Sequence, residues 1–153
     1  MANDAWYTNG KLLVEQQSLD LTAATSKLIL VTTGYTFSQS HDFVADLGAT
    51  ELTVVGYVRK TNGTDFNLAL SSDETATPDT LRYTVDQAVT WSALAAGETI
   101  GALSLISDTG NDATSPLIAH FGQSAGIPTN GGDITAPFDV VNGNLTIEVP
   151  VAA

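Results

Sequence analysis

The sequence predicts an all-β fold: an antiparallel β-sandwich or jelly roll with one short helix near residues 41–47. Two observations carry this prediction. Many short apolar or alternating runs are separated by Gly, Asn, Asp, Pro and Ser, which is the spacing of strands joined by turns. Thr is abundant as well, and with Val and Ile it favours pleated, half-buried surfaces.

The chain length predicts one domain. A chain of 153 residues is long enough to bury a single core, and no linker or internal repeat divides it. We therefore expect a single β-sandwich domain over residues 1–153, with residues 1–10 as a possible extended N-terminal arm.

The strands are predicted from the apolar runs in chain order. The run 81–91 alternates clearly, with Leu81, Tyr83 and Val85 on one side. The predicted strands are 11–16, 27–33, 51–59, 66–70, 81–91, 100–106, 116–121, 133–140 and 144–149.

Turn residues mark two further features. Asn142-Gly143 lies between apolar runs and predicts a tight hairpin, because a type I′ turn needs positive φ at both central residues. Gly101 lies inside a strand pattern and predicts a bulge or a close backbone approach.

The single helix is predicted at 41–47. Ser40 can cap it, Asp42 lies in the first turn where the helix dipole favours an acid, and Gly48 follows its end. The core is predicted from the apolar stripe of this helix and from the alternation of apolar residues in the strands. The residues expected to be mostly buried are Leu28, Leu30, Val54, Tyr57, Leu81, Tyr83, Val85, Trp91, Leu103, Ile118 and Ile147.

Charge constrains the partners. The chain has 17 acids against five bases, a net charge of −12, and only Arg59 and Lys60 are adjacent bases. Nucleic-acid binding needs clustered Lys and Arg that release counterions, so we expect no nucleic-acid partner and, for the same reason, no anionic membrane partner. Cysteine is absent, which excludes disulfides and thiolate zinc sites.

Two histidines are the first candidates for chemistry. His41 and Asp42 are adjacent, but neighbours on a helix point about 100° apart and do not readily form a dyad. His41 is therefore interpreted as structural. His120 lies in a strand-like run, and neither histidine belongs to a metal-binding motif such as H-E-x-x-H.

The acidic loops 71–74 and 107–112 lack the EF-hand order of oxygen ligands, so solvated turns are expected there. No G-x-S-x-G nucleophile turn or phosphate-binding glycine loop is present. We therefore predict no catalytic residues, no cofactor, no metal and no enzymatic activity.

Several segments together resemble a family of tailed-phage virion structural proteins. The chain reads KLILVTTGYTF, HDFVADL, ELTVVGYV, VTWSAL and SDTGNDATSPLIAHFG in this order. Family members carry a strand that ends in VT-x-GYT, an HDF start, a GY strand, a VTW segment and a DTG…SPLI hairpin. Here these fall at 31–36, 41–43, 56–57, 89–91 and 108–118.

The resemblance implies a capsid decoration (cement) protein that binds the outer surface of a bacteriophage head and stabilises the shell. The implied partners are the major capsid protein and further copies of this chain, as a homodimer or homotrimer. Synthesis in the host cytoplasm is expected, because residues 1–17 show no secretion signal. A tail or fibre module that binds a host receptor is the alternative.

The apolar ends are the candidate contacts with the capsid or with other subunits. Exposed apolar segments usually mark interaction surfaces. The alternative is a terminal strand that packs back on its own domain. The candidate residues are Trp6, Tyr7, Val149, Pro150 and Val151.

Overall fold

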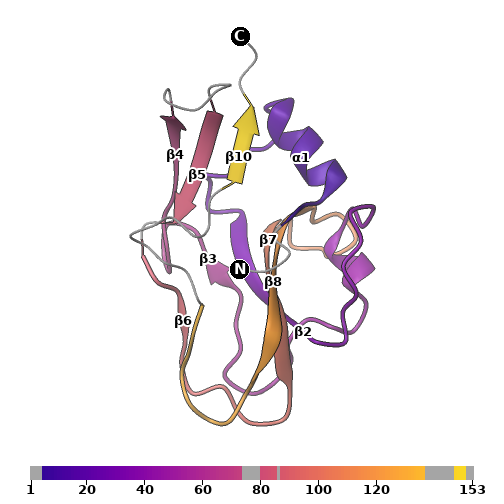
Figure 1. Cartoon of the computed structure of the whole chain (residues 1–153), viewed down its shortest axis with the longest axis vertical. Helices are drawn as coiled ribbons and strands as arrows, with labels where there is room; N and C mark the ends of the chain where they lie inside the picture. The colour runs from indigo at the N-terminus through magenta and orange to yellow at the C-terminus, as the bar shows by residue number, and fades with distance from the viewer. Residues whose placement is uncertain (1–4, 74–79, 86, 137–146, 151–153) are drawn as a thin grey trace.

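The protein folds as an all-β antiparallel sandwich with one short α-helix, seen here in a computed structural model (Figure 1). The structure describes residues 5–73, 80–85, 87–136 and 147–150. The predicted fold class is confirmed. Several strands and the helix lie at other positions along the chain than predicted. These differences decide where the surfaces described below lie.

The main sheet has five strands in the order β1-β8-β7-β2-β3, and every neighbouring pair is antiparallel. Its centre is formed by three long strands that the sequence predicts well. The bounds of the five strands are β1 Ala5–Trp6, β8 Leu117–Pro128, β7 Thr99–Ser107, β2 Ser26–Thr32 and β3 Lys60–Thr61.

Two smaller sheets accompany the main sheet. One has the order β10-β5-β4, with β10 Ile147–Pro150, β5 Thr80–Val85 and β4 Leu68–Asp73. The other pairs β6 Thr90–Trp91 with β9 Ile134–Thr135. Figure 1 shows β4 and β5 side by side above β6, along the left-hand side of the main sheet.

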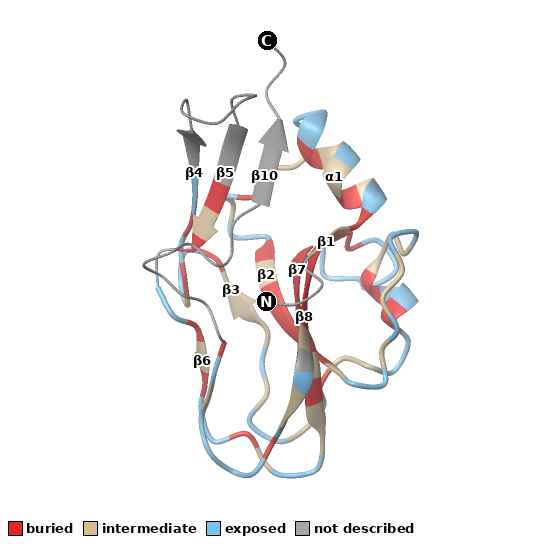
Figure 2. Cartoon of the chain, in the orientation of Figure 1, coloured by how far each residue is buried: buried red, intermediate tan, exposed pale blue. Residues whose placement is uncertain are grey.

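Both faces of the main sheet are buried. Strand residues alternate between faces, so Leu28 and Leu30 point to one side and Ile29 and Val31 to the other. The first side joins the large core cluster, which includes Trp91 and residues of β4 and β5. The second side joins a smaller cluster that the N-terminal segment and the 33–47 segment cover. Figure 2 shows the resulting buried run along β2, β7 and β8.

The predicted core is largely confirmed. Val54 and Tyr57 are half-buried and pack against the large cluster. The side chains of Leu81 and Ile147 lie outside the described residues. Those buried as predicted are Leu28, Leu30, Tyr83, Val85, Trp91, Leu103 and Ile118.

The first predicted strand, 11–16, is wrong, because residues Thr8–Glu15 form the α-helix α1. Gly10 and Val14 are its buried residues, four positions apart and therefore on one helix face. The short apolar run Leu12–Val14 is typical of a strand, but the burial of this segment follows the helical period. The possible N-terminal arm is also corrected for residues 5–10, which form β1 and the start of α1 rather than an extended arm.

The predicted helix at 41–47 is reduced to one 3-10 turn, Val44–Leu47. The backbone N–H groups of Asp42 and Phe43 donate to the Asp46 carboxylate, both at 2.9 Å. The Val44 N–H donates to the Ser115 carbonyl instead of extending a helix. Tertiary partners thus take the donors that a longer helix would need.

The predicted strand at 51–59 is also wrong. The Tyr57 N–H donates to the Val54 carbonyl, so residues 54–57 form a tight turn. Gly56 has a φ of +92°, which is the left-handed value that a type II turn requires at its third position. The apolar residues in this segment therefore belong to a turn with two inward and two outward side chains.

The remaining elements agree in part with the sequence. The run 81–91 divides into β5 and β6, and the Asn142-Gly143 hairpin lies outside the described residues. The close approach predicted at Gly101 is confirmed: a Cβ there would lie 2.8 Å from the Thr33 Cα, and the β7–β8 register shifts between Ile100 and Ala102. No helix in the described part of the chain could span a membrane.

Gly10 provides a direct test of how α1 packs on β8. A Cβ at this position would overlap the Leu117 carbonyl oxygen and lie 2.6 Å from the Ile118 Cα. Gly10→Ala should therefore lower the free energy of unfolding by about 2–3 kcal/mol, although alanine is the better helix former. Gly34→Ala is the control, because its Cβ would meet side chains at 3.6 Å or more. Urea unfolding measures both variants, and equal stability of the two would contradict this packing.

Candidate functional site

The structure places the sequence-predicted contact residues in different environments. Trp6 lies in β1, pairs with Ala119 and is half-buried against the large core. Tyr7 is 0% exposed. Val149 and Pro150 lie in β10 with their backbone paired to β5, and Val151 lies outside the described residues.

The burial of Tyr7 corrects its proposed role as an exposed contact. The Tyr7 N–H donates to the Ile118 carbonyl, which holds the segment on β8. The N-terminal strand therefore packs back on its own domain, the alternative that the sequence left open.

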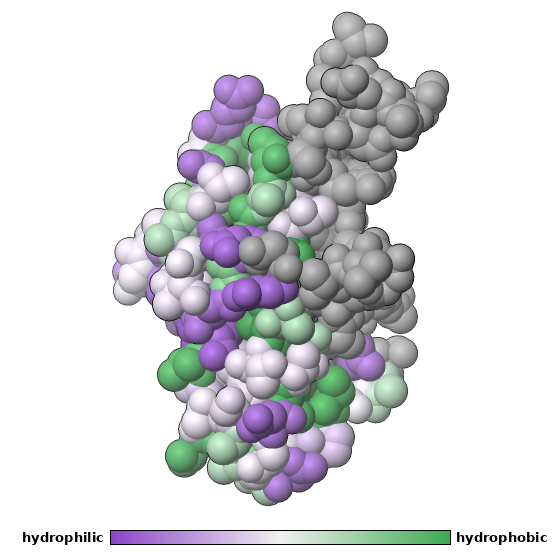
Figure 3. All heavy atoms as spheres, turned by 90° about the vertical axis from the view of Figure 1, so that its left-hand side faces the viewer, coloured by the Kyte–Doolittle hydropathy of each residue, from purple (hydrophilic) through white to green (hydrophobic). Residues whose placement is uncertain are grey.

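A different exposed apolar feature is found at residues 53–58, which we call the ridge. Val54 and Tyr57 point inward and pack against the large core. Val55 and Val58 point outward and are 81% and 59% exposed. These are the two most exposed large apolar side chains in the described part of the chain. On the face in Figure 3, apolar residues are scattered among polar ones.

The ridge is fixed from both sides by hydrogen bonds. The Val55 carbonyl accepts from the Ala95 N–H at 3.0 Å, and the Val58 carbonyl accepts from the Trp91 indole at 2.8 Å. The Glu98 carboxylate accepts from the N–H groups of Thr53 and Val54, at 2.7 and 3.0 Å. The two outward valines are therefore presented on a backbone that is held in place.

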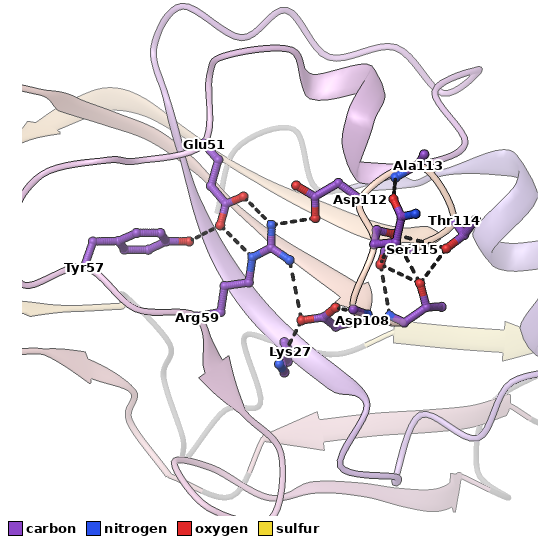
Figure 4. Close-up of polar contacts among 12 residues, drawn as sticks. Lys27, Glu51, Tyr57, Arg59, Asp108, Asp112, Ala113, Thr114 and Ser115 are labelled. Atoms are coloured by element: carbon purple, nitrogen blue, oxygen red, sulfur yellow. Dashed lines mark hydrogen bonds and ion pairs between the residues drawn. The ribbon is translucent and has the colours of Figure 1, made fainter.

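Beside the ridge lies a cluster of charged residues centred on Arg59, which we call the arginine cluster (Figure 4). Arg59 donates to both carboxylate oxygens of Glu51, from Nε at 2.9 Å and from Nη2 at 2.6 Å. The guanidinium also reaches Asp112 at 2.9 Å and Asp108 at 3.5 Å. This bidentate geometry is the strong form of the arginine–carboxylate pair.

Two further groups complete the arginine cluster. Lys27 on β2 pairs with Asp108 at 2.8 Å. The Tyr57 hydroxyl donates to Glu51 at 2.8 Å and accepts from the Leu30 N–H at 3.2 Å. Through these contacts the cluster connects the ridge to β2 and to the 107–112 loop (Figure 4).

The pKa values follow from this geometry. The hydrogen bond to Glu51 is the main cause of the raised pKa of Arg59. Burial is the main cause of the raised pKa of Tyr57, and the Glu51 carboxylate adds to it. Burial by itself would raise the pKa of Asp108, but hydrogen bonds from Lys27 and the Gly110 N–H outweigh it, so that pKa lies below its usual value. These shifts keep Arg59 and Asp108 charged and Tyr57 neutral at neutral pH.

The 107–112 loop is an exposed turn over residues 109–112, as predicted, but Asp108 is not solvated in the same way. Asp108 is tied to two bases, and the loop is internally ordered by Ser115, whose Oγ accepts from the Thr109 N–H and donates to the Asn111 carbonyl. The cluster joins residues up to 81 positions apart. The sequence signal was only the adjacent Arg59-Lys60 pair, and nothing in it indicated the acids that surround Arg59.

The two histidines lie on either side of Tyr35. The Tyr35 hydroxyl lies 2.8 Å from His41 Nδ1, and its ring centroid lies 5.8 Å from that of His120. The Tyr7 hydroxyl lies 3.1 Å from that of Tyr35. His120 also stacks on Phe37 at 4.6 Å. Among the described residues, no group of three or more His, Asp or Glu side chains is placed to hold a metal ion.

His120 is buried at 5% exposure, and burial lowers its pKa from 6.5 to about 4. The imidazole is therefore neutral at pH 7. Its Nδ1 is a buried polar atom with no hydrogen-bond partner. The pKa of Tyr7 is raised, first by burial and then by its hydrogen bond with Tyr35. Both groups are neutral in this environment.

An open groove of about 680 Å³ lies beside His120, at the edge of the smaller core cluster. Three main-sheet strands form its floor, with the small residues Gly101, Ala102 and Gly122. The segment that follows β2 supplies Tyr35 and Phe37. The groove was not predicted, because its residues are spread over four strands and a loop without a local motif.

Comparisons of the chain with models of protein families, with curated proteins and with solved structures found no match. The functional interpretation therefore depends on the surfaces described above and on the sequence resemblance.

Removing the central charge tests the arginine cluster. Arg59→Met leaves Glu51, Asp108 and Asp112 without their shared cation, so it should lower the free energy of unfolding by about 2 kcal/mol. Lys11→Met is matched in charge but breaks only an exposed helix pair to Glu15 at 3.7 Å, which should change stability by less than about 0.5 kcal/mol. Thermal unfolding measures both, and an equal effect would contradict the central role of Arg59.

His120 predicts a pH dependence. Its pKa is about 4 in the folded protein and near 6.5 in the unfolded chain, so between these values the unfolded state binds more protons. Stability should fall as pH falls through this window, by about 2 kcal/mol more in the wild type than in His120→Phe between pH 7 and pH 4.5. The urea midpoints of both proteins at the two pH values give this difference. Groups that titrate alike in both proteins contribute equally and cancel. Equal pH dependence of the two proteins would contradict it.

Proposed function

We propose that this protein is a virion structural protein of the tailed-phage type, which binds the outer surface of the head and stabilises the shell. The sequence resemblance to phage virion proteins motivates the proposal. The observation that carries it is the ridge, where Val55 and Val58 are exposed on a fixed backbone.

The ridge has the properties of a docking element. Exposed apolar side chains gain free energy when a partner covers them. Because the backbone hydrogen bonds at Val55 and Val58 already fix the turn, little conformational entropy is lost on binding. Two valines give a small contact, but many copies on a lattice gain from avidity where copies associate with each other.

The charge distribution favours the outside of the shell. Four of the five bases form ion pairs with acids of the same domain: Lys11, Lys27, Arg59 and Lys60. Their positive charge is paired with acids of the same domain, and the 17 acids leave the chain with a net charge of −12. Such a surface is repelled by packaged DNA and keeps particles apart in solution.

The proposed partners are the major capsid protein and further copies of this chain, as a homodimer or homotrimer. The proposed role is structural rather than enzymatic. A tail or fibre module that binds a host receptor is the second candidate, and the open groove beside His120 is the observation in its favour.

The test uses heads that lack this protein, purified from a phage with its gene deleted. Labelled wild-type protein should bind these heads saturably. Val55→Asn combined with Val58→Asn should weaken binding at least tenfold, because a polar side chain loses the apolar gain without disturbing the fixed turn. Leu12→Asn is the matched control, since Leu12 is an exposed apolar residue on α1, away from the ridge, and it should bind as the wild type does.

Electron microscopy of intact particles then locates the protein. Regular density on the outside of the capsomers is the expected result. Density only at the tail tip, with bare capsomers, would overturn the decoration proposal and favour the receptor-binding alternative. Unchanged binding of the double valine variant would overturn the ridge as the contact.

A further inference from the structure

The groove beside His120 has an uncharged and hydrogen-bonding lining. All eleven residues that line it are neutral at pH 7, including His120. Its polar groups are the hydroxyls of Thr32, Thr33 and Thr36 and the amide of Gln123. Aromatic surface from Tyr35 and Phe37 accompanies them. The volume of about 680 Å³ is in the range of small-molecule sites.

The lining selects against most ligand classes. An anionic ligand would meet no cation among the described residues that line the groove, and it would approach a chain of net charge −12. A cationic ligand would find no carboxylate among the lining residues to pair with. A purely apolar ligand would cover three threonine hydroxyls and an amide without offering them partners, which costs free energy for each group. A neutral ligand rich in hydroxyl groups avoids all three costs, because it carries no charge and its hydroxyl groups can pair with the threonine hydroxyls and the amide.

His120 lies beneath the groove rather than opening into it. Its ring contributes to the lining, but the side chain is 5% exposed and its Nδ1 is a buried atom. The groups within reach of a ligand are therefore the exposed Thr33 and Thr36 and the half-buried Gln123.

We propose that this groove is a binding site for a neutral oligosaccharide. The threonine hydroxyls and the Gln123 amide bond its hydroxyl groups, and the aromatic rings contact its apolar C–H faces. The exposed Thr33 and Thr36 and the half-buried Gln123 form the accessible polar surface, so that a chain of sugars can lie along them. This inference goes beyond the proposed attachment to the head and does not depend on it, because the groove and the ridge are formed by different residues.

The experiment is a screen of the isolated full-length protein against an array of neutral, anionic and cationic glycans, followed by NMR titration of ¹⁵N-labelled protein with the best neutral hit. Maltotriose and chitotriose serve as defined neutral probes, and trigalacturonate and the chitosan trimer as charged comparators. We expect a Kd at or below about 1 mM for a neutral glycan. Amide shifts should gather at Gly101, Ala102, Gly122 and Gln123.

Variants then test the lining. Thr36→Ala and Gln123→Ala, at positions that are exposed or half-buried, should each weaken binding at least fivefold without changing the unfolding midpoint. Gln16→Ala and Thr64→Ala are matched controls at exposed positions elsewhere and should bind as the wild type does.

Three results would overturn the proposal: no neutral glycan binds at ten times the expected Kd, the amide shifts lie outside the groove, or the charged comparators bind as well as the neutral probes. Wild-type NMR mapping decides the location even if a variant is unstable. Because soluble protein is used, a negative result here leaves the head-binding assay unaffected, and failure of that assay leaves glycan binding unaffected.

Discussion

The main physical constraint on this fold is that the central strands β2, β7 and β8 are buried on both faces. In β2 the residues Leu28 to Val31 are all buried, so neither face of the sheet can be left to water. One face is covered by the smaller sheets, as in any sandwich. The other needs a second cover, and the chain provides it from segments with little regular structure. The N-terminal segment and the 33–47 segment therefore pack over this face, which would otherwise be exposed to water.

This second cover explains the most restrictive contacts in the protein. α1 reaches β8 closely only because Gly10 has no side chain, and Tyr7 fills the space beside it. Tyr35 and Phe37 extend the cover along the sheet toward Gly101. Where their cover ends, Thr33 and Thr36 are exposed. The groove is the place at which the covering layer stops.

The sequence predicted what depends on local pattern and missed what depends on distant partners. The apolar runs that form β2 and β7, and the close approach at Gly101, follow from local residues and were found. The 51–59 segment has the composition of a strand, but Glu98 binds its backbone and Gly56 turns it. α1 was mistaken for a strand because its helical period is carried by Gly10 and Val14, and a glycine does not register as a buried position. The acidic partners of Arg59 gave no signal, since they lie up to 53 positions away.

The ridge and the groove lie on opposite sides of this doubly covered sheet. The inward residues of the ridge, Val54 and Tyr57, pack against the large core on one face. The aromatic residues of the groove, Tyr35 and Phe37, pack against the smaller core on the other face. A protein attached through its ridge would therefore leave its groove free to bind a second molecule. The arginine cluster lies beside the ridge and joins it to β2, a strand that contributes to both cores. The same central strands thus support both surfaces, so a substitution that loosens β2 should affect ridge and groove together, whereas changes at Val55 or Gln123 should act on one surface alone.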